Sequence, residues 1–153
     1  MNILFVCTGN TCRSPMAEGL FKKIAAEDSE FELNIYSGGL NASDGLPANE
    51  NAVTALLEYG VDISEHRSKN VDAGKIADAD IILTMTRAHK DMLLYLFGGA
   101  AEEKTYTLLE YIGENGDIED PFGGDLRIYR ICAKRIYNAL LKAYEIIRRE
   151  FDV

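Results

Sequence analysis

The sequence is poor in cysteine, in basic residues and in long apolar runs, and each shortage excludes a class of protein. Its three cysteines are an odd number without zinc-ligand spacing, which indicates thiols in a reducing, cytoplasmic compartment rather than a secreted disulfide framework. No apolar run approaches the roughly 20 residues of a membrane span, and no basic segment precedes a long apolar stretch at the start. The 16 basic and 25 acidic residues give a net charge of −9, which disfavours binding to nucleic acids or anionic membranes. Any anion that the protein binds must therefore be held by a local site.

Strand-like and helix-like patterns alternate along the 153 residues, whose length suits a single predicted domain, residues 1–153. Short apolar runs predict strands at Asn2–Val6, Phe31–Ser37, Asp80–Met85 and Lys104–Leu108. Apolar residues at helical spacing predict helices from Ser14 onward, at about Pro47–Tyr59, at Arg87–Phe97 and from Leu126 to about Arg149. This alternation predicts a three-layer α/β domain with right-handed crossovers and a site at the carboxyl ends of the strands.

Individual residues predict where some of these elements begin or end and which face of the last helix is buried. Ser14 is a good N-cap and Pro15 suits the first helical position, whereas Gly38 and Gly39 are expected to end the second strand. The last helix should pack on the sheet through an apolar stripe of Ile128, Cys132, Ile136, Leu140, Ala143 and Ile147. Cys132 is thus expected to be a core residue.

The loop between the first strand and the first helix pairs a cysteine with an arginine. It reads Cys7-Thr8-Gly9-Asn10-Thr11-Cys12-Arg13-Ser14. A short loop wound at a helix N-terminus directs successive backbone N–H groups inward, and the helix dipole adds positive potential. Gly9 and Asn10 tolerate the left-handed backbone conformations that such a loop uses. The segment from Thr8 to Ser14 is therefore predicted to be a phosphate cradle.

Two side chains of this loop supply the chemistry of phosphoryl transfer. The planar guanidinium of Arg13 can make bidentate hydrogen bonds to phosphate oxygens and stabilise their charge during transfer. The positive field of the cradle favours the thiolate of Cys7, which is the nucleophilic form, and the Ser14 hydroxyl can donate a hydrogen bond to it. The alternative is a buried apolar Cys7 and a solvated Arg13, but the buried strand and the helix start around them favour the functional interpretation.

A phosphocysteine intermediate also needs an acid for the leaving atom and then a base for water. Asp120 is the best candidate, because it lies in an acidic loop before the last helix and Pro121 forces it out of the helical region. Asp117 and Glu119 are competing acids in the same loop. The other interpretation is that Asp120-Pro121 forms an ordinary turn without a catalytic role.

Taken together, these residues resemble the low-molecular-weight protein tyrosine phosphatases. The resemblance runs through the whole chain, at Val6 to Pro15, Ser37-Gly38-Gly39, His66 and Asp120-Pro121. It implies a three-layer α/β/α fold with a four-stranded parallel sheet. It also implies that Cys7 is the nucleophile, Arg13 the phosphate clamp, Ser14 the thiolate stabiliser and Asp120 the general acid and base.

The same resemblance assigns supporting roles. Asn10 is implied to hold the loop through a polar network with Ser37 and His66, which makes His66 a support rather than a catalytic base. The implied partners are phosphorylated proteins as substrates and inorganic phosphate as product. The reaction requires no cofactor or metal ion, because the cradle supplies the positive charge.

Departures from the tyrosine-specific members point to the substrate. Many of those members carry Ile where this chain has Thr11, whereas Thr resembles the bacterial protein-arginine phosphatases of the family. The loop Asn41 to Gly45 contains no aromatic residue, so the mouth of the pocket offers only Phe122 for ring contacts. A phosphoarginine guanidinium would lie between a carboxylate such as Asp120 and the face of Phe122. Phosphoarginine is thus the preferred substrate group, with phosphotyrosine as the alternative and a neutral role for Thr11 left open.

The same residues disfavour two other classes of protein. An arsenate reductase would need further cysteines to relay a disulfide, and residues 80 to 95 contain none. A phosphate-binding module without turnover is disfavoured because Cys7, Arg13 and Asp120 are all present.

Cys12 lies in the same loop as Cys7, and we hypothesise that the two form a reversible disulfide that protects Cys7 from over-oxidation. The alternative for Cys12 is a packed thiol.

Overall fold

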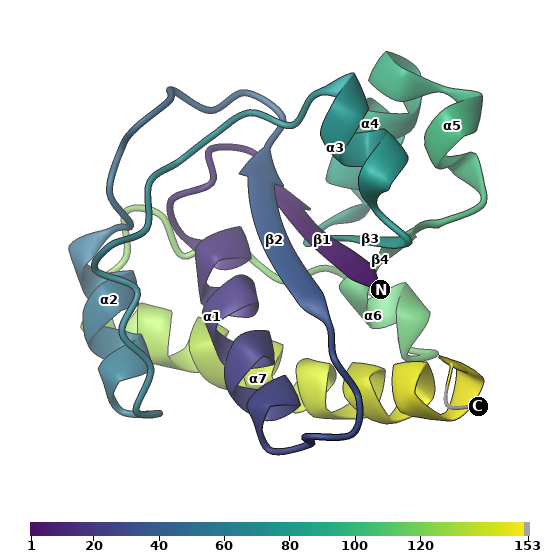
Figure 1. Cartoon of the computed structure of the whole chain (residues 1–153). Helices are drawn as coiled ribbons and strands as arrows, with labels where there is room; N and C mark the ends of the chain where they lie inside the picture. The colour runs from purple at the N-terminus through teal and green to yellow at the C-terminus, as the bar shows by residue number, and fades with distance from the viewer. Residues whose placement is uncertain (152–153) are drawn as a thin grey trace.

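The computed structural model describes residues 1–151 and contains four strands among helices of very different length (Figure 1). The strands are β1 (Asn2–Cys7), β2 (Asn34–Gly39), β3 (Ile81–Thr84) and β4 (Thr105–Thr107). The longer helices are α1 (Arg13–Ala26), α2 (Glu50–Leu57), α4 (Arg87–Phe97) and α7 (Leu126–Phe151). Short helices are α3 (Ala73–Asp78), α5 (Gly99–Glu102) and α6 (Leu108–Tyr111).

The four strands form one parallel sheet in the order β2-β1-β3-β4. In register, Phe5 of β1 is paired with Ser37 on one side and with Leu83 on the other. The central strand β1 is apolar on both faces, as a strand covered on both sides must be. The predicted α/β/α fold with a four-stranded parallel sheet is confirmed.

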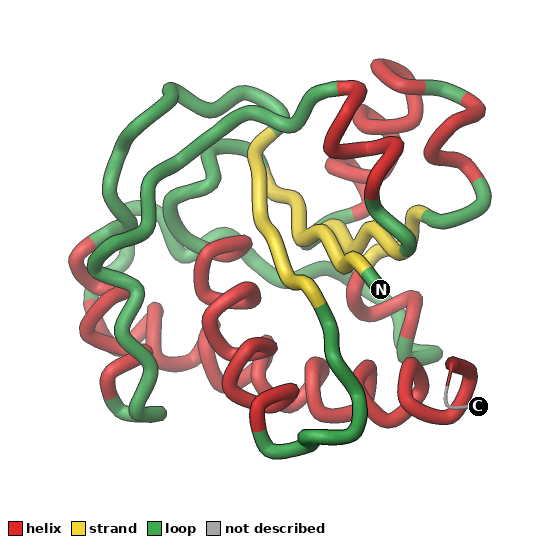
Figure 2. The backbone as a smooth tube through the Cα atoms, viewed as in Figure 1, coloured by secondary structure: helices red, strands yellow, loops and turns green. Residues whose placement is uncertain are grey.

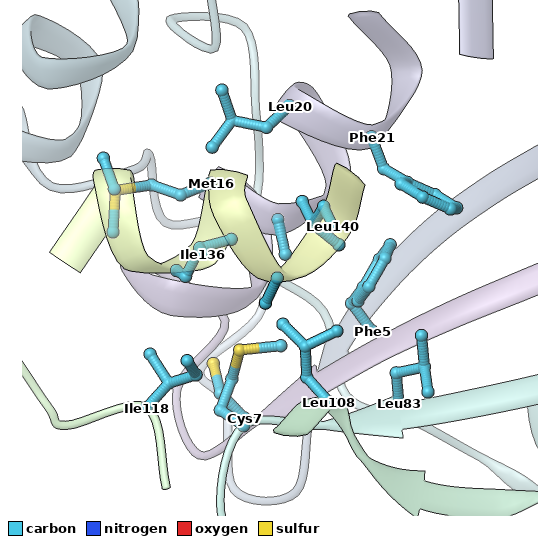
Figure 3. Packing of buried hydrophobic residues seen from close by; sticks show 14 of the residues in the cluster. Phe5, Cys7, Met16, Leu20, Phe21, Leu83, Leu108, Ile118, Ile136 and Leu140 are labelled. Carbon is cyan, nitrogen blue, oxygen red and sulfur yellow. The ribbon is translucent and has the colours of Figure 1, made fainter. Parts of the chain in front are cut away.

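Each face of the sheet buries its own set of apolar side chains. On one face, Phe5 packs with residues of α1 and α7, and Figure 3 shows Met16, Leu20, Ile136 and Leu140 in this cluster with it. On the other face, a smaller cluster joins the strands to α3, α4 and α5 through Leu4, Val6, Ile76, Ile82, Leu93 and Ala101. Cys7, at the end of β1, is buried in the same cluster as residues of α1 and α7.

The carboxyl ends of the parallel strands meet at one edge, where the loops gather. Figure 2 shows two long loops, 40–49 and 58–72, side by side above this edge. Gly45 donates its backbone N–H to the carbonyl of Ser68, and Ser68 donates its own to Leu46, so the two loops support one another. Further along the chain, Ile118 donates to the carbonyl of Met85, which draws the acidic loop 117–125 to the end of β3.

Several predicted boundaries were wrong for physical reasons. Ser14 is not the N-cap of α1: the helix begins at Arg13, its N-cap Cys12 makes no side-chain cap bond, and Pro15 is its third residue. Gly38 and Gly39 do not lie after β2 but are its last two residues, paired with Val6 and Cys7. A Cβ on Gly39 would lie 2.5 Å from the carbonyl oxygen of Thr8, so the close approach of the loop requires glycine there.

The stripe of α7 also differs from its prediction at its first member. Ile128 is 41% exposed, and the neighbouring Tyr129 is fully buried in its place. The remaining predicted members of the stripe, Cys132, Ile136, Leu140, Ala143 and Ile147, are buried. None of the helices built by residues 1–151 combines the length and the apolar character that crossing a bilayer requires.

Candidate active site

A pocket of about 220 Å³ opens above the end of β1, at the edge where the loops gather. Its walls come from two segments far apart in the sequence, the loop after β1 and the acidic loop before α7. The lining residues are Cys7, Thr8, Gly9, Thr11, Cys12, Arg13, Asp120 and Phe122. A larger groove of about 890 Å³ lies elsewhere, between α1 and residues 60–69, and contains none of these side chains. We place the chemistry in the smaller pocket, because a thiol, a guanidinium and a carboxylate line it together.

The sulfur of Cys7 is held by a hydrogen bond at the start of α1. Its Sγ lies 2.9 Å from Ser14 Oγ, and both side chains are buried. Asn10 donates from Nδ2 to the same Ser14 oxygen at 2.9 Å. Since that oxygen accepts from Asn10, the single hydroxyl hydrogen of Ser14 is left to donate to the sulfur. The Ser14 hydroxyl is thus placed to stabilise negative charge that develops on the sulfur.

Asn10 is the residue that fixes the loop. It is fully buried and adopts a positive φ of 57°, which is rare outside glycine. Its Nδ2 also donates to Ser37 at 3.0 Å, and its Oδ1 accepts from the backbone N–H of Lys69 at 3.1 Å. His66 donates from Nε2 to the Asn10 carbonyl at 2.7 Å. The structure thus brings together Asn10, Ser37 and His66, with the left-handed conformation held from both sides.

The Ser37 hydroxyl extends this network outward. Having accepted from Asn10, it donates to Glu18 Oε1 on α1, and Glu18 is in turn paired with Lys22 at 2.7 Å. Burial lowers the pKa of His66 from its ordinary value, and its bond to the Asn10 carbonyl opposes that effect. Because a carbonyl only accepts, His66 carries a hydrogen on Nε2 in this contact. The imidazole is committed to the loop rather than to the pocket.

Arg13 spans the gap between the two walls of the pocket. Its side chain is buried, and its Nη1 donates to the carbonyl of Ile118 at 2.9 Å. Its Nη2 lies 3.6 Å from Asp120 Oδ2. A guanidinium has five N–H donors, so donors remain for an anion in the pocket after the bond to Ile118. The one side chain therefore anchors the acidic loop and faces the cradle.

Comparison with known proteins agrees with this geometry. The family described as low molecular weight phosphotyrosine protein phosphatase matches residues 2–152. The chain belongs to this family. Among its relatives, a protein-arginine-phosphatase of Bacillus subtilis is 44% identical over 98% of this chain and 99% of its own length. A low molecular weight protein-tyrosine-phosphatase, PtpB, of Staphylococcus epidermidis is 38% identical over 93% of this chain and 96% of its own.

Solved structures of the family have the same fold. The arginine phosphatase YwlE, in a mutant with a phosphorylated active-site serine, superposes with a TM-score of 0.94 at 38% identity, covering 99% of this chain and 98% of its own. The resemblance noted in the sequence is confirmed, including its likeness to the arginine-phosphatase branch. The chain is accordingly a phosphatase of this family, with relatives named for two different phospho-residues.

Within the phosphatase pocket, the structure separates the three candidate acids. Asp120 lines the pocket with Cys7, and its Oδ1 accepts from the backbone N–H of Phe122 at 3.0 Å, which orients the carboxylate. Asp117 instead accepts from the backbone N–H of Arg87 at 2.8 Å, at the first residue of α4. Glu119 is exposed and is not among the pocket residues. Of the three, Asp120 is the carboxylate that faces the sulfur's pocket.

The other two thiols differ from Cys7 in their surroundings. Cys12 lines the pocket but is largely buried, and its Sγ lies 3.3 Å from the hydroxyl of Tyr129. Burial raises the pKa of the Cys12 thiol, and burial raises that of Cys132 to about 12. Both are therefore neutral thiols at physiological pH. Cys132 lies in the core stripe of α7, as predicted.

His89 contacts the loop but was not predicted from the sequence to do so. His89, on the first turn of α4, is only 7% exposed and places Nε2 at 2.9 Å from Thr8 Oγ1. Burial and, next, the nearby Arg13 lower its pKa to about 4. Little in the sequence indicates that His89 lies beside the loop, because a single histidine in an amphipathic helix is common.

Residues 1–151 hold no group of three or more His, Cys, Asp or Glu side chains placed to bind a metal ion.

The low pKa of His89 predicts an acid-linked loss of stability. The unfolded chain takes up a proton at His89 near its ordinary pKa of 6.5, whereas the folded protein does so only near 4. Between these values the unfolded state binds more protons, so stability falls as the pH falls and is fully present above about pH 6.5. Between about pH 7 and about pH 4.5 this one group is expected to remove about 2 kcal/mol.

The measurement is urea unfolding of the wild type and of His89→Leu at both pH values. The variant, which has no imidazole to protonate, should lose about 2 kcal/mol less than the wild type over the same interval. Equal losses in the two proteins would show that His89 titrates alike in the folded and unfolded states.

Proposed function

We propose that this phosphatase hydrolyses phosphorylated side chains of proteins through a phosphocysteine at Cys7, with phosphoarginine as its preferred substrate. The observation that carries the proposal is the shared pocket, in which the Cys7 sulfur, the Arg13 guanidinium and the Asp120 carboxylate line one small space. Phosphorylated proteins are the proposed partners and inorganic phosphate the product. A cytoplasmic location, and the absence of nucleic-acid partners, remain predictions from charge and cysteine content.

In the first step, the Cys7 thiolate attacks the phosphorus atom and the bond to the leaving atom breaks. For phosphoarginine that leaving atom is a guanidino nitrogen, and for phosphotyrosine the phenolic oxygen. Asp120, protonated at this stage, donates its proton to the leaving atom. Backbone N–H groups of Thr8 to Ser14 and the Arg13 fork stabilise the charge on the three equatorial oxygens.

In the second step, water attacks the phosphocysteine and the bond between sulfur and phosphorus breaks. The Asp120 carboxylate now accepts a proton from the water, which returns it to the acid form. The sulfur leaves as a thiolate, stabilised by the Ser14 hydroxyl at 2.9 Å. Inorganic phosphate is released, and both groups are ready for another cycle.

Acid quenching during turnover tests this sequence of steps. Rapid mixing with p-nitrophenyl phosphate should give a burst of nitrophenol, and mass spectrometry of the quenched protein should find phosphate on Cys7. An enzyme that turns over without any phosphoprotein would point instead to direct attack by water. The phosphorylated active-site serine in the YwlE mutant supports the covalent route.

Two features of the pocket favour phosphoarginine. Thr11 lines the pocket, and the family resemblance implies Ile at this position in many tyrosine-specific members. Phe122, at the mouth, is the one aromatic residue among those lining the pocket, and Asp120 lies beside it. A guanidinium can contact the carboxylate and the ring face together.

The alternative, phosphotyrosine, is supported by the same Phe122. Its side chain is 76% exposed at the pocket mouth, where it could stack on a tyrosine ring. The S. epidermidis relative is named for tyrosine. Both substrates would use the same cysteine, arginine and aspartate. The preference between them would therefore depend on other residues that line the pocket, Thr11 and Phe122.

Replacing Thr11 with Ile tests whether Thr11 contributes to the preference for phosphoarginine. We expect Thr11→Ile to lower the ratio of kcat/KM for phosphoarginine over phosphotyrosine by about tenfold, the worth of one hydrogen bond to a polar group. Thr54→Ile makes the same chemical change on the exposed face of α2 and should leave the ratio alone. An unchanged preference in Thr11→Ile would remove Thr11 from the argument.

We also propose that Cys12 protects Cys7 during oxidation. A peroxide would oxidise the Cys7 thiolate to a sulfenic acid, and the Cys12 thiol would then displace water from it to form a disulfide. Cys12 suits this role because it lines the same pocket and is a neutral thiol. A reducing thiol would restore both groups.

Peroxide treatment followed by dithiothreitol checks this proposal. The wild type should regain most of its turnover. Cys12→Ser should be inactivated irreversibly, because the sulfenic acid on Cys7 has no neighbouring Cys12 thiol to react with and is oxidised further. Cys132→Ser removes a thiol buried in the core of α7 and should recover as the wild type does. Identical recovery of Cys12→Ser would leave Cys12 as a packed thiol.

A further inference from the structure

His89 contacts the phosphate-binding loop at Thr8. Its backbone is fixed, because Thr86 caps α4 by accepting its N–H at 3.1 Å. Its side chain is buried, and Nε2 lies 2.9 Å from Thr8 Oγ1. Thr8 itself is exposed and lines the pocket together with Cys7 and Arg13. Thr8 thus contacts a buried histidine and also lines the pocket.

The surroundings of the imidazole select its tautomer. Nδ1 is buried and has no hydrogen-bond partner among residues 1–151. A buried N–H without an acceptor is rarer in proteins than a buried acceptor left unpaired. The hydrogen of the neutral ring therefore belongs on Nε2, where it is donated to Thr8 Oγ1. Burial and the charge of Arg13 lower the pKa of His89 to about 4, so the ring is neutral at neutral pH.

This assignment decides what the Thr8 hydroxyl can do. A hydroxyl has one hydrogen to donate and two lone pairs. Since Thr8 Oγ1 accepts from His89, its own hydrogen is left for another partner. The pocket that Thr8 lines is the space in which the phosphoryl group is proposed to bind.

We propose that His89 is a positioning residue of the phosphatase, which orients the Thr8 hydroxyl so that it donates a hydrogen bond to the bound phosphoryl group. This inference rests on the proposed function and adds a side-chain donor to the backbone cradle. A bond from a hydroxyl to a charged phosphoryl oxygen contributes to both substrate and transition-state binding. His89 touches neither the substrate nor the sulfur and acts through Thr8.

A double-mutant cycle with Thr8→Val and His89→Leu tests the proposal. Each single variant should lower kcat/KM on p-nitrophenyl phosphate by about tenfold, and the double variant should be no worse than Thr8→Val alone. His89→Gln, which keeps an amide donor near the position of Nε2, should recover most of the loss of His89→Leu. In a Cys7→Ser background, His89→Leu should weaken the binding of inorganic phosphate, measured by calorimetry, by a similar factor.

Asp91→Asn is the matched control, because it changes the same helix at an exposed ion pair with Arg87 and should keep wild-type kinetics. Thermal unfolding at neutral pH identifies any variant that merely fails to fold. Independent, additive losses for Thr8→Val and His89→Leu, or full activity in His89→Leu, would overturn the proposal while the phosphatase reaction stands. A wild-type protein without turnover would instead overturn the proposed function itself.

Discussion

Replacing Cys7 with Ser is expected to abolish multiple turnover of p-nitrophenyl phosphate, lowering kcat by about 10⁴-fold or more. The reason lies in the acidity of the nucleophile, because a serine hydroxyl is a far weaker acid than a cysteine thiol and a poorer nucleophile. The backbone cradle and Arg13 are untouched, since the change replaces one buried sulfur by oxygen at the end of β1. Phosphate binding should therefore persist, as isothermal calorimetry can measure.

The control for this variant is Cys132→Ala, which removes a thiol from the core stripe of α7. It should cost stability through a lost contact but keep the turnover of the wild type. Turnover by Cys7→Ser within tenfold of wild type would mean that another group attacks phosphorus. Loss of both turnover and phosphate binding would mean that the cradle itself depends on the sulfur.

Replacing Asp120 with Asn is expected to be the second most damaging change. An amide can neither donate the acid's proton nor accept one from water, so kcat/KM should fall by about 10²- to 10⁴-fold on phosphoarginine and phosphotyrosine peptides. On p-nitrophenyl phosphate the loss in the first step should be much smaller, because nitrophenolate leaves without a proton. This dependence on the leaving group separates a lost acid from a merely disturbed pocket.

Asp117→Asn and Glu119→Gln are the matched controls, since both are carboxylates of the same loop. Asp117 accepts from the backbone of Arg87 and Glu119 is exposed, so neither change should alter the dependence on the leaving group. If Asp117→Asn instead shows the large, leaving-group-dependent loss, the acid has been assigned to the wrong residue. Chemical unfolding of each variant guards against a loss of structure.

The sequence predicts the pieces of this site better than their contacts. The sequence points to Cys7 and Arg13 because a buried strand, a short loop and a helix start predict a place for the cradle between them. Asp120 was chosen from three acids by the neighbouring proline, and the structure places it in the pocket. These inferences depend on local chain geometry, which short sequence patterns encode well.

Contacts between distant segments were not predictable in this way. His89 meets Thr8 across 81 positions of the chain, and no local pattern marks the pairing. Gly38 and Gly39 read as strand breakers, yet β2 keeps both because Val71 and the Thr8 carbonyl approach too closely for a side chain. Position relative to other elements, rather than propensity, decides such residues.

The missed helices show a related limit. The structure contains three short helices, α3, α5 and α6, of four to six residues, which are too short for an apolar period to emerge. At the start of α7 the predicted stripe includes Ile128, whereas the core takes Tyr129, whose hydroxyl reaches the Cys12 sulfur. Tyr129 therefore combines burial in the core with a polar contact to the loop at Cys12.

The most direct test of the account is kcat/KM on phosphoarginine and phosphotyrosine forms of one otherwise identical peptide, with Cys7→Ser as the blank. We predict turnover of both by the wild type, a clear preference for phosphoarginine and none above background in the blank. A preference for phosphotyrosine would keep the mechanism and overturn the substrate assignment. Turnover that persists in the blank would contradict the central claim that Cys7 carries the phosphoryl group.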